Sequence, residues 1–307
     1  MRGDRLVNEL NMDDDIVELF QACSNEGRWG PADELGTLNH ITDAKRLEAA
    51  RLVTLGTAVE LGRSLRPGPS AVARSPLVQH MLLESVAPSS AVDLIEVTPH
   101  DPSITHVDAL CHVFWEGRAY NGRSQRDVMR REGLTFGSLG THPGGVVTRG
   151  VLLDVAATRK TPWLSASDFV TAADLDAAER LAGVSVGVGD AVVVHVGRDA
   201  RVRAEGGQSP LTRAGLHANA LPWLFDRGVS VYTGDCTERL PYPSERVPFP
   251  LHQVGLVAMG LCMVDSPATE PLVNACESLR RCDFLFTFSA PRIAGATGFP
   301  VNPVCLF

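Results

Sequence analysis

Short runs rich in Val and Leu alternate with segments of helical periodicity along the chain, and this alternation restricts the fold to the α/β class. The expected strands are residues 57–61, 77–84, 92–97, 146–155, 184–188, 191–196, 229–233 and 283–288, and the expected helices are 14–23, 43–52, 171–182, 216–226, 251–263 and 272–280. The middle of the chain looks antiparallel, so a regular βαβ series is not expected. We expect one large domain over residues 36–307, preceded by an N-terminal arm or lid over residues 1–35.

The charge balance and the apolar content exclude several classes of partner. The 307 residues include 28 basic and 36 acidic side chains, for a net charge of −8, and they contain no Lys/Arg block, so nucleic-acid binding is not expected. The longest apolar stretch, 254–264, is much shorter than the roughly 20 residues of a membrane-spanning helix. The N-terminus lacks signal-peptide features, and the seven cysteines form no C-x-x-C pair, so we expect free thiols in a cytoplasmic protein.

One thirteen-residue segment gathers three of the nine histidines and an aspartate: His100, His106, Asp108 and His112. His106 and Asp108 are two residues apart, so on an extended strand their side chains project to the same face. Imidazole and carboxylate together suit Zn²⁺ or Mn²⁺. A turn would bring His112 back over such a metal, where a neutral imidazole can act as a general base. The spacing alone leaves open a surface strand whose histidines have no chemical role.

The segment THVDALCHVFWEGRAYNGR, at 105–123, resembles the signature of the cyclase-like metal-dependent hydrolases, which include bacterial kynurenine formamidase and isatin hydrolase. Thr105, His106, Asp108 and His112 match the second half of that family's usual motif, H-x-G-T-H-x-D-x-P-x-H. Further blocks of the longer members are similar to GVVTRGVLLDVA, AGLHANALPWL, PLHQVGLVAMG and GATGFPVNPVCLF, in the same order. The resemblance implies a swivelling β/β/α fold with a compact β-barrel-like core and flanking helices. It also implies a homodimer or homotetramer.

The resemblance further implies a divalent metal, Zn²⁺ or Mn²⁺, with one ion per chain. His106 and Asp108 match metal ligands of the family, and His252, in PLHQ, matches a ligating histidine of the formamidases. Asp265 stands where those enzymes have a ligating glutamate, one methylene longer. His112 matches the catalytic histidine of the motif.

The chain departs from the family motif at its first histidine. Pro102 occupies that position, and a proline side chain cannot bind a metal ion. His100, two residues earlier, is the candidate replacement. The alternatives are one metal held by fewer ligands, two metals bridged by Asp108, or a site that has lost its metal.

Four further residues are candidates for substrate binding. Trp115 and Tyr120 follow the motif, and aromatic side chains beside a metal often form a platform for a flat substrate. Packing around the Gly117 turn is the alternative for both. His80 lies on an expected strand, near the place where family members often have a histidine; it either lines the pocket or is a core residue. His217 opens an expected helix, whose N-terminus favours anions such as a substrate carboxylate.

The residues and the resemblance together indicate a metal-dependent amidohydrolase. It would open a C–N bond in a small aromatic amide, formamide or lactam, with His112 as the general base. The alternative is a ring-forming cyclase or dehydratase of secondary metabolism that uses the same site, even without metal. The lesser alternative is an inactive binding protein, because Pro102 removes one ligand. In each case the expected partner, besides other copies of the chain, is a small molecule.

Overall fold

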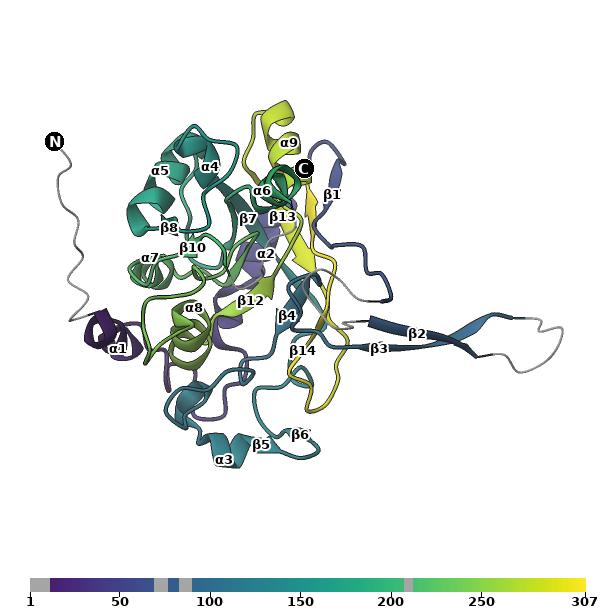
Figure 1. Cartoon of the computed structure of the whole chain (residues 1–307), viewed down its shortest axis with the longest axis vertical. Coiled ribbons are helices and arrows are strands. Elements are labelled where there is room, and N and C mark those ends of the chain that lie inside the picture. Colours follow the sequence, from purple (N-terminus) through teal and green to yellow (C-terminus); the bar gives the residue numbers. More distant parts are fainter. Residues whose placement is uncertain (1–11, 69–76, 83–89, 207–211) are drawn as a thin grey trace.

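A nine-stranded sheet, curled into a half-barrel and flanked by helices, dominates the part of the chain that the structure describes (Figure 1). The computed structural model describes residues 12–68, 77–82, 90–206 and 212–307. The strand order in the sheet is β1-β15-β13-β7-β9-β11-β12-β4-β14. The predicted α/β fold with a barrel-like core and flanking helices is confirmed.

Four parallel strands form the centre of the sheet: β7 (Val146–Asp154), β9 (Ala191–His195), β11 (Val231–Gly234) and β12 (Cys262–Asp265). Their side chains are mostly apolar and almost all buried, as expected for strands that are covered on both faces. Polar residues stand at their carboxyl ends: Asp154, His195 and Asp265 close three strands, and Asp235 follows the fourth. Parallel sheets usually bind their ligands at this edge.

Antiparallel strands extend the sheet on both sides. On one side β13 (Asp283–Phe288) pairs with β7, followed by β15 (Val304–Leu306) and β1 (Ala58–Glu60). On the other side β4 (His106–Asp108) pairs with β12, and β14 (Gly298–Pro300) pairs with β4. The predicted metal-binding segment therefore lies between two strands, next to the end of β12.

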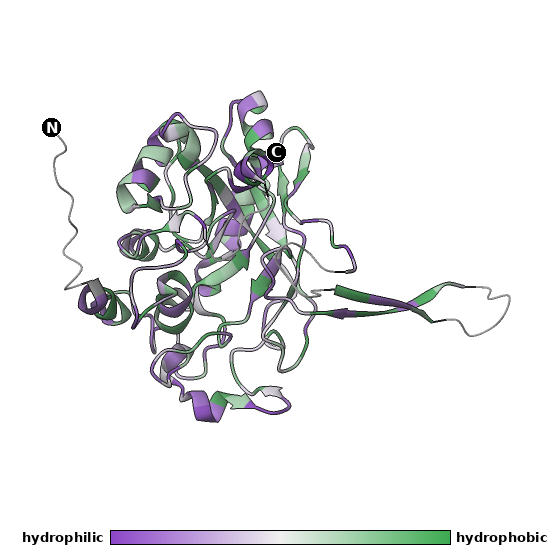
Figure 2. Ribbon diagram, viewed as in Figure 1, coloured by the Kyte–Doolittle hydropathy of each residue, from purple (hydrophilic) through white to green (hydrophobic). Residues whose placement is uncertain are grey.

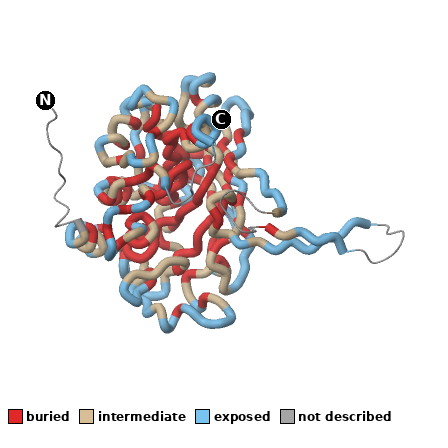
Figure 3. The backbone as a smooth tube through the Cα atoms, in the orientation of Figure 1, coloured by how far each residue is buried: buried red, intermediate tan, exposed pale blue. Residues whose placement is uncertain are grey.

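Helices cover the sheet, and the buried strands form the red centre of Figure 3. α2 (Asp43–Ala50) packs against β7 and β13, whereas α5 (Ala172–Ala182) and α9 (Glu270–Leu279) pack against β7. The remaining helices are α1 (Met12–Ala22), η1 (Gly36–His40), η2 (Tyr120–Gly122), α3 (Gln125–Val128), α4 (Val155–Thr158), α6 (Arg198–Glu205), α7 (Ala220–Asp226), α8 (Pro250–His252) and the π-helix η3 (Gln253–Met259). None of the helices in the described residues has the length and apolar character that a membrane crossing requires.

Three small sheets complete the described strands. They pair β2 (Leu77–Leu82) with β3 (Val92–Val97), β5 (Met129–Arg130) with β6 (Gly133–Leu134), and β8 (Phe169–Val170) with β10 (Gly215–Leu216). The antiparallel β2–β3 hairpin projects away from the body (Figure 1). The last two residues of the predicted strand 77–84, and residues 1–11 of the predicted arm, lie outside the described residues.

Three predicted elements are wrong in type or extent. The predicted strand 184–188 is a loop, in which the Val186 amide donates to Glu179 Oε1 instead of to a neighbouring strand. The predicted helix 216–226 begins only at Ala220, because residues 215 and 216 pair with β8. The predicted helix 251–263 ends before Gly260, whose φ of 64° is the left-handed conformation that terminates helices, and β12 follows at once.

Candidate active site

A cavity of about 260 Å³ lies beside β4 and joins residues that are far apart in the sequence. All the residues predicted to bind metal or to act as the base line this cavity: His100, His106, Asp108, His112, His252 and Asp265. They come from β4 and its flanking segments, from α8, and from the carboxyl end of β12. The structure therefore brings the whole predicted set together.

β4 and β12 position three of the donors. His106 and Asp108 are the first and last residues of β4, so their side chains share one face, and His106 Nε2 lies 3.4 Å from Asp108 Oδ1. The antiparallel register places Asp265 directly opposite His106. His252 ends α8, where the helix changes into a π-helix, a feature often found at functional sites. Its Nε2 lies 3.2 Å from Asp265 Oδ2 and 3.8 Å from Asp108 Oδ2.

The spacing of these donor atoms fits a divalent metal ion. Ligand atoms about 2.0–2.2 Å from a tetrahedral zinc lie roughly 3.3–3.6 Å from one another, close to the distances found here. Asp108 Oδ2 and Asp265 Oδ1 are buried and have no hydrogen-bond partner among the described residues. Unpaired buried carboxylate oxygens are costly unless a cation or a ligand group satisfies them. Four residues therefore form a donor set that suits Zn²⁺ or Mn²⁺: His106, Asp108, His252 and Asp265.

The second ring nitrogens of the two candidate histidine ligands, His106 and His252, are held by acceptors. His106 Nδ1 donates to the Ile104 carbonyl at 2.9 Å, which leaves Nε2 facing Asp108. His252 Nδ1 lies 2.9 Å from Glu238 Oε2, and its Nε2 faces Asp265. Metal-ligating histidines are usually oriented in this way by a carbonyl or a carboxylate. Each of these two histidines is thus oriented by a hydrogen-bond acceptor, as metal sites require.

His100 reaches Asp108 although Pro102 replaces the motif histidine. His100 Nδ1 lies 2.9 Å from Asp108 Oδ1, and its Nε2 lies 2.9 Å from Thr297 Oγ1. The ring fits against β14 because Gly298 has no side chain: a Cβ there would lie 2.5 Å from His100 Cε1. Pro102 forms part of the cavity wall.

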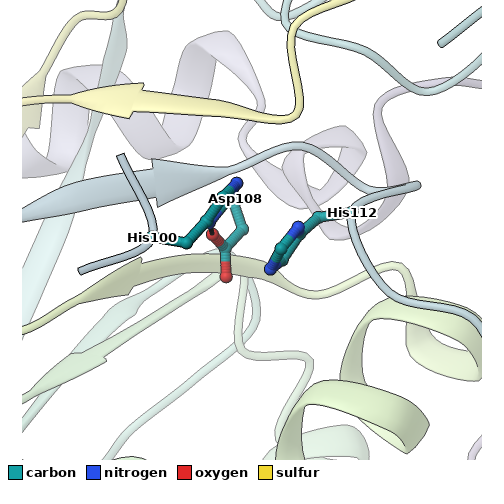
Figure 4. A group of neighbouring side chains, drawn as sticks. All are labelled: His100, Asp108 and His112. Carbon is teal, nitrogen blue, oxygen red and sulfur yellow. Dashed lines mark ion pairs between the residues drawn. The ribbon is translucent and has the colours of Figure 1, made fainter. Parts of the chain in front are cut away.

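His112 lies beside the same carboxylate. A turn, closed by the His112 amide and the Ala109 carbonyl at 2.9 Å, directs the chain back after β4. The His112 ring stacks on that of His100, with ring centres 3.5 Å apart and planes 4° from parallel. His100, Asp108 and His112 offer ligand atoms within 4.8 Å of one another, and Figure 4 shows the three side chains converging. The structure therefore places the predicted base next to the predicted metal site.

Burial and the neighbouring charges give the histidines of the site different pKa values. Burial, together with the neighbouring histidines, lowers the pKa of His112 to about 4, so this imidazole is neutral near pH 7. Burial alone would lower the pKa of His106, but hydrogen bonding to Asp108 and the charges of Asp108 and Asp265 raise it to about 9. Burial of His252 is likewise outweighed by Glu238 and Asp265, which raise its pKa well above the usual value. Of His106, His112 and His252, His112 is therefore the one that is neutral near pH 7 in the metal-free protein.

The two aromatic residues predicted to bind substrate pack elsewhere. Trp115 stacks on Phe20 of α1, with ring centres 3.7 Å apart. Tyr120 is fully buried, and its hydroxyl donates to Asp33 Oδ2 at 2.7 Å. Neither lines the cavity. Both instead hold the described part of the predicted N-terminal arm against the body.

The two remaining substrate-binding candidates also lie away from the cavity. His80 is exposed on the β2–β3 hairpin, which projects from the body (Figure 1). His217 accepts a hydrogen bond from the Asn219 amide at 3.2 Å, and its ring packs edge-on against Phe169. Neither residue is part of the cavity wall. Within one chain, the predicted substrate-binding set is therefore not brought together.

Sequence reasoning missed two charged residues of the cavity wall, Glu238 and Arg213. Glu238 is fully buried, and the positive charge of His252 outweighs its burial and lowers its pKa. The available signal was the segment DCTER, which directly follows the buried strand β11. Polar residues just after a buried parallel strand are candidates for a site at the sheet edge.

The comparison with protein families shows to which family the chain belongs. Residues 37–238, more than half of the chain, match the family model described as "Putative cyclase". The chain belongs to this family. The resemblance to the cyclase-like hydrolases is thereby confirmed, and the part matched to the cyclase family includes β4 and His112. No curated protein sequence matches the chain.

Solved structures share the fold of this cyclase-family chain. A protein described as a novel cyclase superposes with a TM-score of 0.80 at 23% identity, over 92% of this chain and 99% of that chain. An isatin hydrolase bound to the product analogue thioisatinate gives 0.57 at 16% identity, over 86% and 95%. A predicted metal-dependent hydrolase from Bacillus stearothermophilus gives 0.50 at 11% identity, over 82% and 98%. At these identities the likeness establishes the fold.

Proposed function

We propose that the protein is a metal-dependent hydrolase that opens the C–N bond of a small amide, formamide or lactam. This proposal rests on the position of the neutral His112 beside the donor set. The set offers a cation two buried carboxylate oxygens that have no hydrogen-bond partner among the described residues. The fold shared with an isatin hydrolase and with a predicted metal-dependent hydrolase supports it. His106, Asp108, His252 and Asp265 would hold Zn²⁺ or Mn²⁺, with His100 beside them.

The cation and the residues around it would have different roles in the reaction. A divalent cation at this site supplies a Lewis acid that polarises a carbonyl and makes water more acidic. His112, neutral and stacked on His100, accepts a proton from the attacking water and delivers it to the leaving nitrogen. Val113 and Phe249 add apolar wall to the cavity, which suits the ring of a flat substrate.

Amine release tests this function. The metal-loaded protein is incubated with N-formyl anilines, N-acetyl anilines and five-membered aromatic lactams, and the released amine or opened ring is measured. We expect turnover that requires Zn²⁺ or Mn²⁺. Ring closure, or lactone turnover without metal, would replace this proposal with the cyclase reaction. Absence of turnover on every class, with metal bound, would contradict it.

Metal binding is expected to release protons. His106, with a pKa of about 9, carries a proton at pH 7 in the metal-free protein, and the pKa of His252 is raised as well. A metal ion requires the neutral imidazoles, so affinity should fall as the pH decreases below about 9. Calorimetric titration of Zn²⁺ at pH 7, in two buffers with different ionisation enthalpies, should give at least about one proton released per ion. Zero release would show that these histidines are not ligands.

We also propose that the protein assembles as a homo-oligomer through the β2–β3 hairpin. Both faces of the hairpin carry exposed apolar side chains, which are 45–57% exposed: Met81, Leu82, Val92, Leu94 and Ile95. Figure 2 shows this apolar character in green. An isolated two-stranded hairpin is marginally stable, and a second copy offers an identical apolar surface and identical strand edges. A symmetric pair of hairpins would cover both the apolar surfaces and the strand edges.

The substitution Ile95→Lys tests the hairpin contact. It places a charge in the apolar surface, and in a symmetric pair the two charges would oppose each other. We expect light scattering after size exclusion to give a dimer or tetramer for the wild type and a monomer for Ile95→Lys. Ile293→Lys, at an exposed isoleucine outside the hairpin, is the matched control. A wild-type monomer, or an unchanged oligomer in Ile95→Lys, would rule out this contact.

A further inference from the structure

Among the residues that the structure describes, one arginine that faces the cavity lacks a complete set of partners. Arg213 lines the cavity, and its backbone is fixed by two hydrogen bonds of 3.0 Å with Leu240. One end of its guanidinium donates from Nη2 to Thr237 Oγ1 at 2.6 Å. Its Nε is buried and has no hydrogen-bond partner among the described residues. A buried donor left in this way usually marks a place that a ligand or a water completes.

The nearest carboxylate is already engaged elsewhere. Glu238 Oε1 lies 3.9 Å from Arg213 Nη2, whereas its two oxygens lie 3.1 and 2.9 Å from His252 Nδ1. Glu238 Oε1 also accepts from Thr237 Oγ1 at 3.0 Å. Glu238 therefore orients His252 and leaves the positive charge of Arg213 only partly compensated.

A second, half-buried arginine strengthens the positive field at this wall. Arg198 Nη2 donates to the carbonyl of Pro102, a cavity residue, at 3.4 Å. Within the described residues no carboxylate lies at ion-pair distance from the Arg198 side chain, whereas Arg63 is paired with Asp199 at 3.0 Å. Burial, and the charges of Arg213 and Arg63, lower the pKa of Arg198 to about 10. Two half-buried guanidinium groups next to one cavity favour an anion in it.

We propose that Arg213, supported by Arg198, forms a subsite for a carboxylate of the substrate. The preferred substrates are then small amides, formamides or lactams that carry a carboxylate separate from the C–N bond that opens. Guanidinium groups bind carboxylates through charge-assisted hydrogen bonds, and the Arg213 side chain, which is 12% exposed, lines the cavity. Arg213 lies near Glu238, which in turn holds His252, so this subsite adjoins the donor set. The reaction part of this inference rests on the proposed function, whereas anion binding does not.

A matched pair of substrates tests the subsite during turnover. 4-Formamidobenzoate carries the carboxylate, and 4-formamidobenzamide is its uncharged analogue. For the metal-loaded wild type we expect kcat/KM to be about tenfold or more higher for the benzoate, and Arg213→Met to lower that ratio by about the same factor, mainly through KM. Arg213→Lys should retain part of the preference. Arg46→Met, at an exposed arginine on α2 paired with Asp43, should leave the ratio unchanged.

The outcomes separate the subsite from the reaction. An equal loss on both substrates in Arg213→Met would mean that Arg213 only supports Thr237 and Glu238, and it would overturn the subsite. If the wild type hydrolyses neither compound, the proposed reaction fails for formamides. The subsite is then tested by binding measurements. Calorimetric titration with benzoate and benzamide should then show a preference of the wild type for benzoate that Arg213→Met loses. An unchanged Kd for benzoate in Arg213→Met would overturn the proposal whether or not the enzyme turns over.

Discussion

Asp108→Asn is expected to lose the metal ion and to lower kcat/KM by about a thousandfold or more, because Lewis-acid stabilisation is worth several kcal/mol. Asp108 belongs to both groups of side chains that could hold a metal ion, one with His100 and His112 and the other with His106 and Asp265. Its carboxylate contacts His100 and His106. Asparagine keeps the shape but removes the charge. Metal content by elemental analysis and kcat/KM on an N-formyl aniline would measure both effects.

Asp176→Asn is the matched control for this substitution. Asp176 lies on α5, where it accepts from Trp223 and Arg227 outside the cavity, so its variant should keep metal and activity. Thermal unfolding of Asp108→Asn shows whether the variant is folded. A folded Asp108→Asn that retains metal and near-normal turnover would contradict the assignment of the site.

His112→Ala is expected to lower kcat by about 10²- to 10⁴-fold while the metal content persists. The reason is that His112 stacks on His100 beside the donor set, and its lowered pKa keeps it neutral and able to accept a proton. Added imidazole should restore part of the rate by entering the space that the side chain leaves. Elemental analysis would measure the metal content of the variant, and steady-state kinetics at pH 7 would measure its rate.

His40→Ala serves as the control, because His40 packs edge-on against Trp29 and is not part of the cavity wall. Its activity should match that of the wild type. If His112→Ala instead loses metal, His112 is a ligand. If it keeps its full rate, another group moves the proton. Either result would remove His112 from the role proposed for it.

Local spacing predicted the part of the site that lies on one strand. The two-residue separation of His106 and Asp108 was sufficient because a strand fixes which side chains share a face. The family resemblance supplied His252 and Asp265, which the structure brings to the same cavity through the β12–β4 register and the end of α8. The resemblance also implied the β/β/α fold with a β-barrel-like core, which local periodicity alone could not determine.

Residues whose role depends on distant contacts were beyond sequence reasoning. Trp115 follows the motif directly, yet Phe20, far away in the sequence, covers its ring. Arg213 precedes β10 and Glu238 follows β11, and only the folded chain brings them to one wall. The predicted strand 184–188 failed because its apolar pattern finds no neighbouring strand, whereas an acidic side chain satisfies its backbone. In each case a long-range contact outweighed the local pattern.

Removal and restoration of metal in the wild-type protein tests the central claim most directly. The protein is purified without an affinity tag or chelator, analysed for metal, stripped, and then reconstituted with Zn²⁺ or Mn²⁺, while hydrolysis of N-formyl anilines and aromatic lactams is followed. We expect about one equivalent of metal per chain, loss of C–N hydrolysis on stripping, and recovery on reconstitution. Hydrolysis that persists at full rate in metal-free protein, or a protein that takes up no metal, would contradict a metal-dependent hydrolase.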